Sequence, residues 1–217
     1  QIYFNFFSFL AKNYIKKHKP FVIWVTWSIW KTSARMIISQ IISESLPKKI
    51  LYTSKKNYNW ELWLSLSVLW ITNYTPSIFW VLKNIFNSIK ISFFWKKQYD
   101  IIFLEYWIDH VWEMDFLLNI VVPDISIITK IDKVHSLQFK TKDIIAWEKY
   151  KLAINTKEIS ILNYDCEYSK KYFDLIKCKK YFYTSNYELN SNEIDIKWIN
   201  YDVLLKNKNI ISTFDLV

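Results

Sequence analysis

Residues 21–33 carry the strongest structural signal in the chain and read Phe21-Val22-Ile23-Trp24-Val25-Thr26-Trp27-Ser28-Ile29-Trp30-Lys31-Thr32-Ser33. The continuous apolar run over residues 21–25 predicts a strand that is buried on both faces. A turn that ends in Lys-Thr follows, and apolar residues from Ala34 to Leu46 then recur as they do in a helix. Strand, turn and helix together have the layout of a phosphate-binding loop, in which backbone N–H groups surround a phosphate.

Tryptophan stands at Trp24, Trp27 and Trp30, where a phosphate-binding turn needs glycine, because only glycine adopts positive φ without strain. The chain contains 12 Trp and no Gly in 217 residues, although average usage of about 7% predicts roughly 15 Gly. Some bacterial lineages reassign the UGA stop codon, and a translation table that reads UGA as Trp would print Trp at each such codon. We therefore hypothesise that every Trp printed here is Gly in the living protein. The alternative is a Gly-free, Trp-rich protein as printed, which a UGG codon at position 30 would establish.

Composition bounds the class of protein. The length suits one domain with a small appendage, and the hydrophobic content of 52% is ample for a core. A net charge of +9 permits a polyanionic partner. AT-rich genes also encode many lysines, however, so the charge alone is weak evidence for such a partner. Cys166 and Cys178 have no companions at metal-binding spacing, so we expect free thiols in a reducing, cytoplasmic compartment. No apolar run reaches the roughly 18 residues of a membrane span.

Strand and helix patterns alternate along the first three quarters of the chain. We expect helices over 2–17, 32–45, 64–70, 75–91 and 141–153, and strands over 21–25, 50–53, 99–106 and 125–130. This order predicts an α/β fold, with a mostly parallel sheet of the phosphate-loop type and helices on both faces. From Ile159 onward, short strands with polar turns predict a small C-terminal antiparallel β subdomain. The expected divisions are a leading helix (1–19), a nucleotide-binding domain (20–165) and a β-rich extension (166–217).

With Gly read for Trp, the loop becomes Thr26-Gly-Ser28-Ile29-Gly-Lys31-Thr32-Ser33, which resembles the loop of the Mur ligase superfamily. Four further blocks resemble this family in the same order: Asn57 to Leu64, Glu105 to Met114, Pro123 to His135, and Ile144 to Lys149. Asn163-Tyr164-Asp165 resembles the Asn-x-Asp that closes the family's core. The sequence departs from the family's pattern at three positions. Position 60, read as Gly, replaces the third Asn of the first block, and Asp109 and Lys130 each replace an Asn.

The resemblance implies ATP and Mg²⁺ as cofactors and assigns the site residues. ATP would be bound by Thr26, Trp27, Ser28, Ile29, Trp30, Lys31, Thr32 and Ser33. The metal ligands would be Thr32, Glu105 and His135, and the catalytic residues Lys31, His135 and Lys149, with Lys149 carbamylated. Substrate would contact Asn57, Asn59 and His110. The alternative is that these residues have no functional role: the turn would bind no ligand, Glu105 would be a solvated strand end, His135 an ordinary loop residue and Lys149 a surface lysine.

The resemblance further implies a cytoplasmic, monomeric ATP-dependent ligase of peptidoglycan synthesis, which adds D-alanyl-D-alanine to a UDP-muramoyl tripeptide through an acyl phosphate. We expect no nucleic-acid partner. The family's N-terminal and C-terminal domains have no counterpart in residues 1–217, so we expect a central domain that is inactive alone. The alternatives are another muramyl ligase, a folylpolyglutamate synthase, a basic nucleic-acid-binding protein suggested by Lys and Tyr near residues 168–187, or an inert Trp-containing polypeptide.

Overall fold

A computed structural model shows the architecture of the chain. It describes residues 2–26, 31–53, 61–71, 77–96, 98–106, 108, 110–129, 131, 141–184, 196–206 and 209–216. The elements in chain order are α1 (Ile2–His18), β1 (Phe21–Thr26), α2 (Lys31–Ser45), β2 (Leu51–Thr53), α3 (Glu61–Val68), α4 (Ile78–Phe93), β3 (Ile101–Tyr106), α5 (Glu113–Ile120), β4 (Ile125–Ile128), α6 (Lys142–Ile154), β5 (Ile159–Asn163), α7 (Glu167–Lys171), η1 (Phe173–Leu175), β6 (Lys179–Thr184), β7 (Ile196–Lys206) and β8 (Asn209–Leu216).

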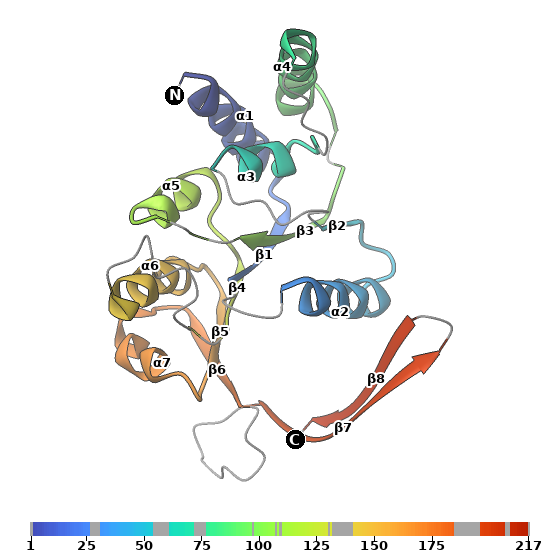
Figure 1. Ribbon diagram of the computed structural model, residues 1–217. Helices are drawn as coiled ribbons and strands as arrows, with labels where there is room; N and C mark the ends of the chain where they lie inside the picture. The colour runs from blue at the N-terminus through green and yellow to red at the C-terminus, as the bar shows by residue number, and fades with distance from the viewer. Residues whose placement is uncertain are drawn as a thin grey trace.

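The strands form one sheet in the order β2-β3-β1-β4-β5-β6-β7-β8. Pairing is parallel from β2 to β6, so β1 lies between β3 and β4 near the middle of the parallel part. In Figure 1, α2 lies on one side of the sheet, and α1, α3, α5 and α6 lie on the other. The predicted mostly parallel α/β sheet with helices on both faces is confirmed.

Strand β1 is buried on both sides because its side chains alternate between two apolar clusters. Ile23 and Val25 lie in a small cluster against Ile38 and Ile42 of α2. Val22 and Trp24 lie in the large cluster under the helices of the opposite face. Since successive strand residues point to opposite faces, a strand covered on both sides needs an unbroken apolar run. Trp24 is therefore a fully buried strand residue, and its expected place in the turn is wrong.

A buried carboxylate aligns β1 with β4. The Oδ2 atom of Asp124 accepts a hydrogen bond from the backbone N–H of Val22 at 2.7 Å, and its Oδ1 pairs with Nζ of Lys157 at 2.9 Å. The backbone N–H of Asp124 in turn donates to the carbonyl of Val22 at 2.8 Å. These contacts set the start of both central strands, and hence the level at which the strands end.

Three details differ from expectation. Helix α3 begins at Glu61, although the helix was expected to begin at residue 64; its apolar side chains Leu64, Leu66 and Val68 are buried. Helix α5 was not expected, since eight residues are too few for a clear period. Strands β5 and β6 are parallel, because α7 and η1 return the chain across the sheet; the antiparallel pattern expected from Ile159 is wrong there.

Strands β7 and β8 form an antiparallel pair, which joins the sheet where Tyr183 and Thr184 of β6 pair in parallel with β7. In Figure 1 this pair extends away from the helices. That residues 166–217 form a subdomain of their own stays a prediction, as do the boundaries after residues 19 and 165.

Two tryptophans hold a backbone conformation that favours glycine. Among the described residues, positive φ occurs at Lys19 (46°), Trp70 (60°) and Trp112 (76°). Trp70 follows α3 in a Schellman turn, in which the N–H of Ile71 donates to Leu66 at 2.8 Å and that of Trp70 to Ser67 at 3.1 Å. Trp70 stands at the position of that turn which glycine usually occupies, since a Cβ is strained there. The backbone thus supports Gly at two of the Trp positions.

Candidate functional site

Strands β1, β3 and β4 end side by side at one edge of the sheet. Val25 is paired with Glu105 of β3 and with Ile127 of β4, so the three strands end at nearly the same level. Helix α2 begins at Lys31, only five positions after Thr26, the last residue of β1. Open parallel sheets bind ligands outside the carboxyl ends of their strands, and helix N-termini attract anions. This edge is therefore the candidate site.

Thr26 closes β1 with its side chain buried at the base of the loop. Its carbonyl accepts hydrogen bonds from the backbone N–H and the Oγ1 hydroxyl of Thr129 at 3.4 and 3.2 Å. The Oγ1 atom of Thr26 itself is buried, with no hydrogen-bond partner among the described residues. A buried hydroxyl needs a partner, and a phosphate oxygen or a loop amide would supply one.

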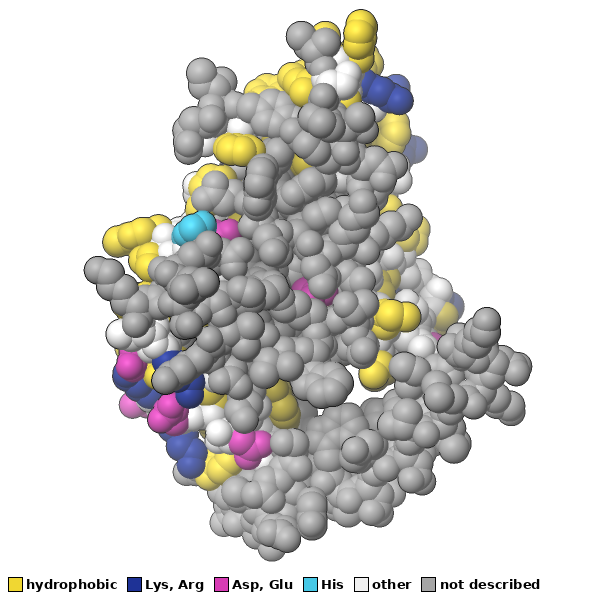
Figure 2. All heavy atoms as spheres, in the orientation of Figure 1, with side chains coloured by type: hydrophobic (Ala, Val, Ile, Leu, Met, Phe, Trp, Pro, Cys, Tyr) yellow, Lys and Arg dark blue, Asp and Glu magenta, His cyan; other side chains and the backbone are white. Residues whose placement is uncertain are grey.

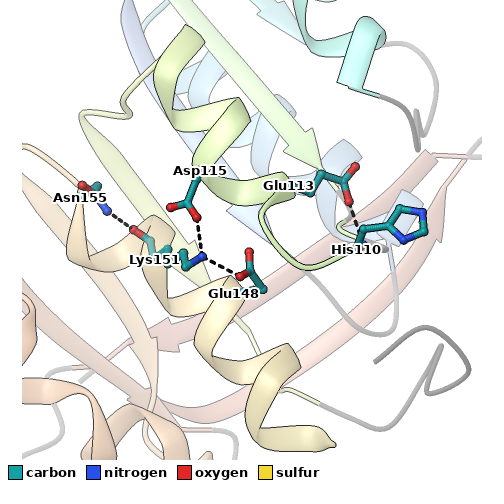
Figure 3. A network of polar contacts seen from close by, with 6 residues as sticks. All are labelled: His110, Glu113, Asp115, Glu148, Lys151 and Asn155. Atoms are coloured by element: carbon teal, nitrogen blue, oxygen red, sulfur yellow. Dashed lines mark hydrogen bonds and ion pairs between the residues drawn. The ribbon is translucent and has the colours of Figure 1, made fainter. Parts of the chain in front are cut away.

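Glu105 stands at the carboxyl end of β3, next to β1, and is 8% exposed. A carboxylate held at this edge is a suitable ligand for a divalent cation. His110 lies on the chain that leads from β3 to α5, and its side chain is exposed. Its backbone N–H donates to Oε2 of Glu113 at 3.1 Å (Figure 3). That contact fixes the backbone at His110, while the imidazole stays open to a ligand.

Lys149 lies on α6 and is 3% exposed, so the alternative of a surface lysine is wrong. Burial of an ammonium group is costly, and α6 carries two more buried charges beside it. Nζ of Lys151 reaches both Oε1 of Glu148 at 2.6 Å and Oδ2 of Asp115 on α5 at 2.5 Å (Figure 3). Burial lowers the pKa of Lys151, but the hydrogen bonds that it donates to Asp115 and Glu148 outweigh burial and raise the pKa overall.

The remaining expected residues lie outside what the structure describes. The loop residues Trp27, Ser28, Ile29 and Trp30 do so, as do Asn57, Asn59 and His135. Lys31, Thr32 and Ser33 form the first turn of α2, and only their backbone is described. The structure thus brings Thr26, the start of α2 and Glu105 to one edge, and the roles assigned to these residues stay predictions.

Two residues that flank β4 had no role in the sequence argument: Asp124 precedes the strand, at the end away from the candidate site, and Thr129 follows it, at the candidate edge. Asp124 and Thr129 both lie in the block from Pro123 to His135, yet the motif alone does not show what they bind. Asp124 sets the register of the central strands, and Thr129 holds the end of β1 to β4. Their partners are about a hundred residues away in sequence, so only the pairing of β1 with β4 reveals the contacts.

The residues at this edge fit a nucleoside triphosphate with a divalent cation. The buried Oγ1 of Thr26 and the N-terminus of α2 suit phosphate oxygens, and the carboxylate of Glu105 suits a hard cation. The loop fits phosphate only if positions 27 and 30 carry no large side chain, since the amides must approach the phosphate closely. The fit of phosphate at this loop therefore depends on the glycine hypothesis.

Comparison with solved structures gives the same fold. The chain is similar to MurF from Acinetobacter baumannii, with a TM-score of 0.69 and 15% identity over 97% of this chain and 39% of that chain. It is similar to the MurF ligase from Thermotoga maritima in complex with ADP, with a TM-score of 0.65 and 16% identity over 97% and 44%. It is also similar to an FPGS mutant from L. casei, with a TM-score of 0.56 and 12% identity over 95% of this chain and 53% of that chain. The chain thus spans well under half the length of these MurF chains.

The fold and the edge at β1 define an α/β domain of the phosphate-loop type. A family model, the Mur ligase middle domain, matches residues 25–215. The chain belongs to this family.

Proposed function

We propose that the chain is the ATP-binding domain of an ATP-dependent, amide-forming ligase of peptidoglycan precursor synthesis. The observation that carries the proposal is the Mur ligase middle-domain match over residues 25–215. The alignment of β1, the start of α2 and Glu105 at one sheet edge supports it, because a triphosphate and its metal ion need all three together. The substrates of the complete ligase would be a UDP-muramoyl tripeptide and D-alanyl-D-alanine, in the cytoplasm and as a monomer.

Two observations support the dipeptide as the incoming amine. The Asn57 to Leu64 and Glu105 to Met114 blocks resemble the members of the family that add D-alanyl-D-alanine. The TM-score is also higher for the two MurF structures, at 0.69 and 0.65, than for the folylpolyglutamate synthase, at 0.56. A substrate panel with the ligase in its full length would distinguish the dipeptide from glutamate or other amino acids.

In this ligase, the terminal carboxylate of the muramoyl peptide attacks the γ-phosphorus of ATP, and ADP leaves. The amine of the incoming dipeptide then attacks the acyl phosphate, and phosphate leaves from the tetrahedral intermediate. Lys31 would hold the β and γ phosphates as a point charge, and Thr32, Glu105 and His135 would hold Mg²⁺, which neutralises charge on the phosphoryl group. The protein contributes positioning and electrostatic stabilisation.

Carbamylation of Lys149 would replace a buried cation by an anion. Lys149 is almost fully buried, where a charged ammonium group is costly to desolvate. A carbamate formed from this amine and CO₂ would suit a region rich in cations once nucleotide and metal are bound. Mass spectrometry of the intact chain with bicarbonate, with Lys149→Arg as the control, would test the modification.

Binding of Mg·ATP, followed by calorimetry, tests the proposal. We expect Trp27→Gly with Trp30→Gly to bind more tightly than the chain as printed, since the loop amides become accessible. In that background, Lys31→Ala should weaken binding by about tenfold or more, because one charge on the phosphates is lost. Lys48→Ala, at an exposed lysine beyond the end of α2, is the matched control and should bind as before. A folded glycine variant that fails to bind Mg·ATP would refute the assignment.

A further inference from the structure

Helix α4 exposes a stripe of large apolar side chains. Phe79, Leu82, Phe86 and Phe93 are between 44% and 81% exposed. Successive residues of an α-helix are about 100° apart, so these four side chains fall within about 60° of one another on one side of α4. Figure 1 places α4 at the end of the molecule farthest from β7 and β8. Exposed apolar patches of this kind mark interaction surfaces.

Lysines flank the stripe, and acidic residues are absent from the surrounding sequence. Lys83 and Lys90 follow the stripe on one side of α4, and Lys96 lies just beyond its end. No Asp or Glu occurs between Glu61 and Asp100, nor anywhere before Glu44. The neighbouring α1 adds Lys12, Lys16 and Lys17. Figure 2 shows hydrophobic side chains and lysines next to each other at this end of the molecule.

The opposite face of α4 is fixed against α1. Oγ of Ser92 donates to the carbonyl of Leu10 at 2.9 Å and accepts a hydrogen bond from Nδ2 of Asn13 at 2.9 Å. Nζ of Lys17 donates to the carbonyl of Phe93 at 2.5 Å. Ser88 and Ile91 are buried on the same face. Because this face is held by buried contacts, the outward direction of the stripe is set by the fold.

We propose that the exposed face of α4 binds an anionic lipid surface. An interfacial helix lies in the plane of the membrane, with Phe and Leu side chains among the acyl chains and lysines at the headgroups. Single-sign charge around an apolar stripe complements a negatively charged leaflet, to which each nearby lysine contributes. Within the described residues, no helix is long and apolar enough to cross a membrane. The stripe itself contains no Trp, and the nearby Lys90 has its Nζ 5.6 Å from the ring centre of Trp95.

Co-sedimentation with vesicles tests the proposal directly. The probes are vesicles of phosphatidylcholine alone and of phosphatidylcholine with about one third phosphatidylglycerol. We expect the chain to bind the anionic vesicles at least about tenfold more tightly, and added salt to weaken this binding. Leu82→Ser with Phe86→Ser should weaken binding by about tenfold or more, as should Lys83→Gln with Lys90→Gln.

Matched controls lie elsewhere on the surface. Leu175→Ser with Ile50→Ser removes two exposed apolar side chains away from α4, and Lys48→Gln with Lys177→Gln removes the same charge. Circular dichroism establishes that each variant is folded. Equal losses in the control and α4 variants, equal binding to neutral and anionic vesicles, or no vesicle binding by the folded chain would overturn the proposal. So would self-association that depends on Leu82 and Phe86 without vesicle binding, since the stripe would then be an interface between copies.

Discussion

The left-handed backbone at Trp70 and Trp112 shows where individual residues conflict with the fold. For an L-residue with a Cβ, this conformation costs about 1–2 kcal/mol, whereas glycine adopts it freely. The side chain of Trp112 is 73% exposed, so little packing holds the indole there. Trp24, by contrast, lies in the core of β1, where its indole is fully buried. The backbone therefore favours glycine at some Trp positions and is neutral at others.

Trp112→Gly should raise the free energy of unfolding by about 0.5–1 kcal/mol, because strain is relieved while a contact with Lys151, 5.3 Å from the ring, is lost. Trp147→Gly is the comparison, since Trp147 is 42% exposed and lies within α6. There glycine should lower stability by about 1 kcal/mol, through its poor helix propensity. Urea unfolding measures both, and a loss of stability in both variants would contradict the strain argument.

Tyr150 is a second residue whose surroundings set a measurable property. Its hydroxyl is buried 2.6 Å from Oγ of Ser169, and burial raises the pKa of Tyr150 above its usual value of 10.0. The unfolded chain ionises this phenol near pH 10, whereas the folded chain keeps it protonated. The contribution of Tyr150 to stability is therefore complete below pH 10 and is lost as the pH rises from there towards the folded pKa.

Tyr150→Phe should lower the free energy of unfolding by about 1 kcal/mol at pH 7, because the hydrogen bond to Ser169 is lost. Above pH 10 its stability should fall less steeply than that of the unchanged chain, by up to about 1.4 kcal/mol per pH unit. Urea titrations between pH 7 and 11.5 measure the two slopes. Parallel curves above pH 10 would show that burial of this phenol does not govern alkaline unfolding.

Helices α5 and α6 are joined by one lysine that serves two carboxylates. Lys151 pairs with Asp115, which is half exposed, and with Glu148, whose side chain is 1% exposed (Figure 3). The second oxygen of Glu148 is buried, with no hydrogen-bond partner among the described residues. The charge of Glu148 therefore depends on Lys151 for compensation. Because Lys149 stands between Glu148 and Lys151 in sequence, the same network holds the part of α6 that carries Lys149 against α5.

Lys151→Met should lower the free energy of unfolding by about 3 kcal/mol, because it leaves a buried carboxylate without a counter-ion. Adding Glu148→Gln should recover part of the loss, since the amide carries no charge. Lys171→Met is the control: its partner Asp143 is largely exposed, so the change should stay within about 1 kcal/mol. Equal losses in the two lysine variants, measured by urea unfolding, would mean that burial does not strengthen the α5–α6 bridge.

In the described part of the region where lysines and aromatic residues alternate, residues 168–184, lysines of the chain lie close to aromatic rings. Nζ of Lys170 lies 4.1 Å from the ring centre of Tyr164, and Nζ of Lys180 lies at the same distance from Phe173. Lys142 and Lys171 are paired with Glu167 and Asp143. Single-strand binding needs open ring faces for stacking. Here lysines of the same chain lie over these rings, which argues against the nucleic-acid hypothesis.

With Gly at positions 27 and 30, the chain by itself should bind Mg·ATP without forming an amide. It spans 39% and 44% of the MurF chains to which it is similar, and both substrates must be held beside the phosphate for ligation. Release of phosphate with a UDP-muramoyl tripeptide and D-alanyl-D-alanine should stay at the background rate. A turnover well above background would contradict this expectation, and it would show that residues 1–217 hold both substrates.

The sequence alone determined the order of the main elements, and it predicts a nucleotide site after β1. An unbroken apolar run predicts a strand covered on both sides, and the turn before Lys31 predicts a phosphate loop, because both signals are local. Helix α5 and the parallel pairing of β6 were missed, since eight-residue segments and strand direction have no strong local signature. The roles of Asp124, Thr129 and Lys151 also required the fold, because their partners are distant in sequence or lie on another helix.

Only the tertiary structure revealed which faces of the elements are covered. Helix α4 has apolar residues on both its buried and its exposed side. The sequence therefore predicts an amphipathic helix without showing which apolar residues meet solvent. Packing on α1 decides this, and it leaves Phe79, Leu82 and Phe86 outside. Backbone handedness is likewise invisible in the sequence: the strain at Trp70 and Trp112 follows from how α3 ends and α5 begins. Local chemistry thus specifies the elements, and packing between distant segments decides their exposure and strain.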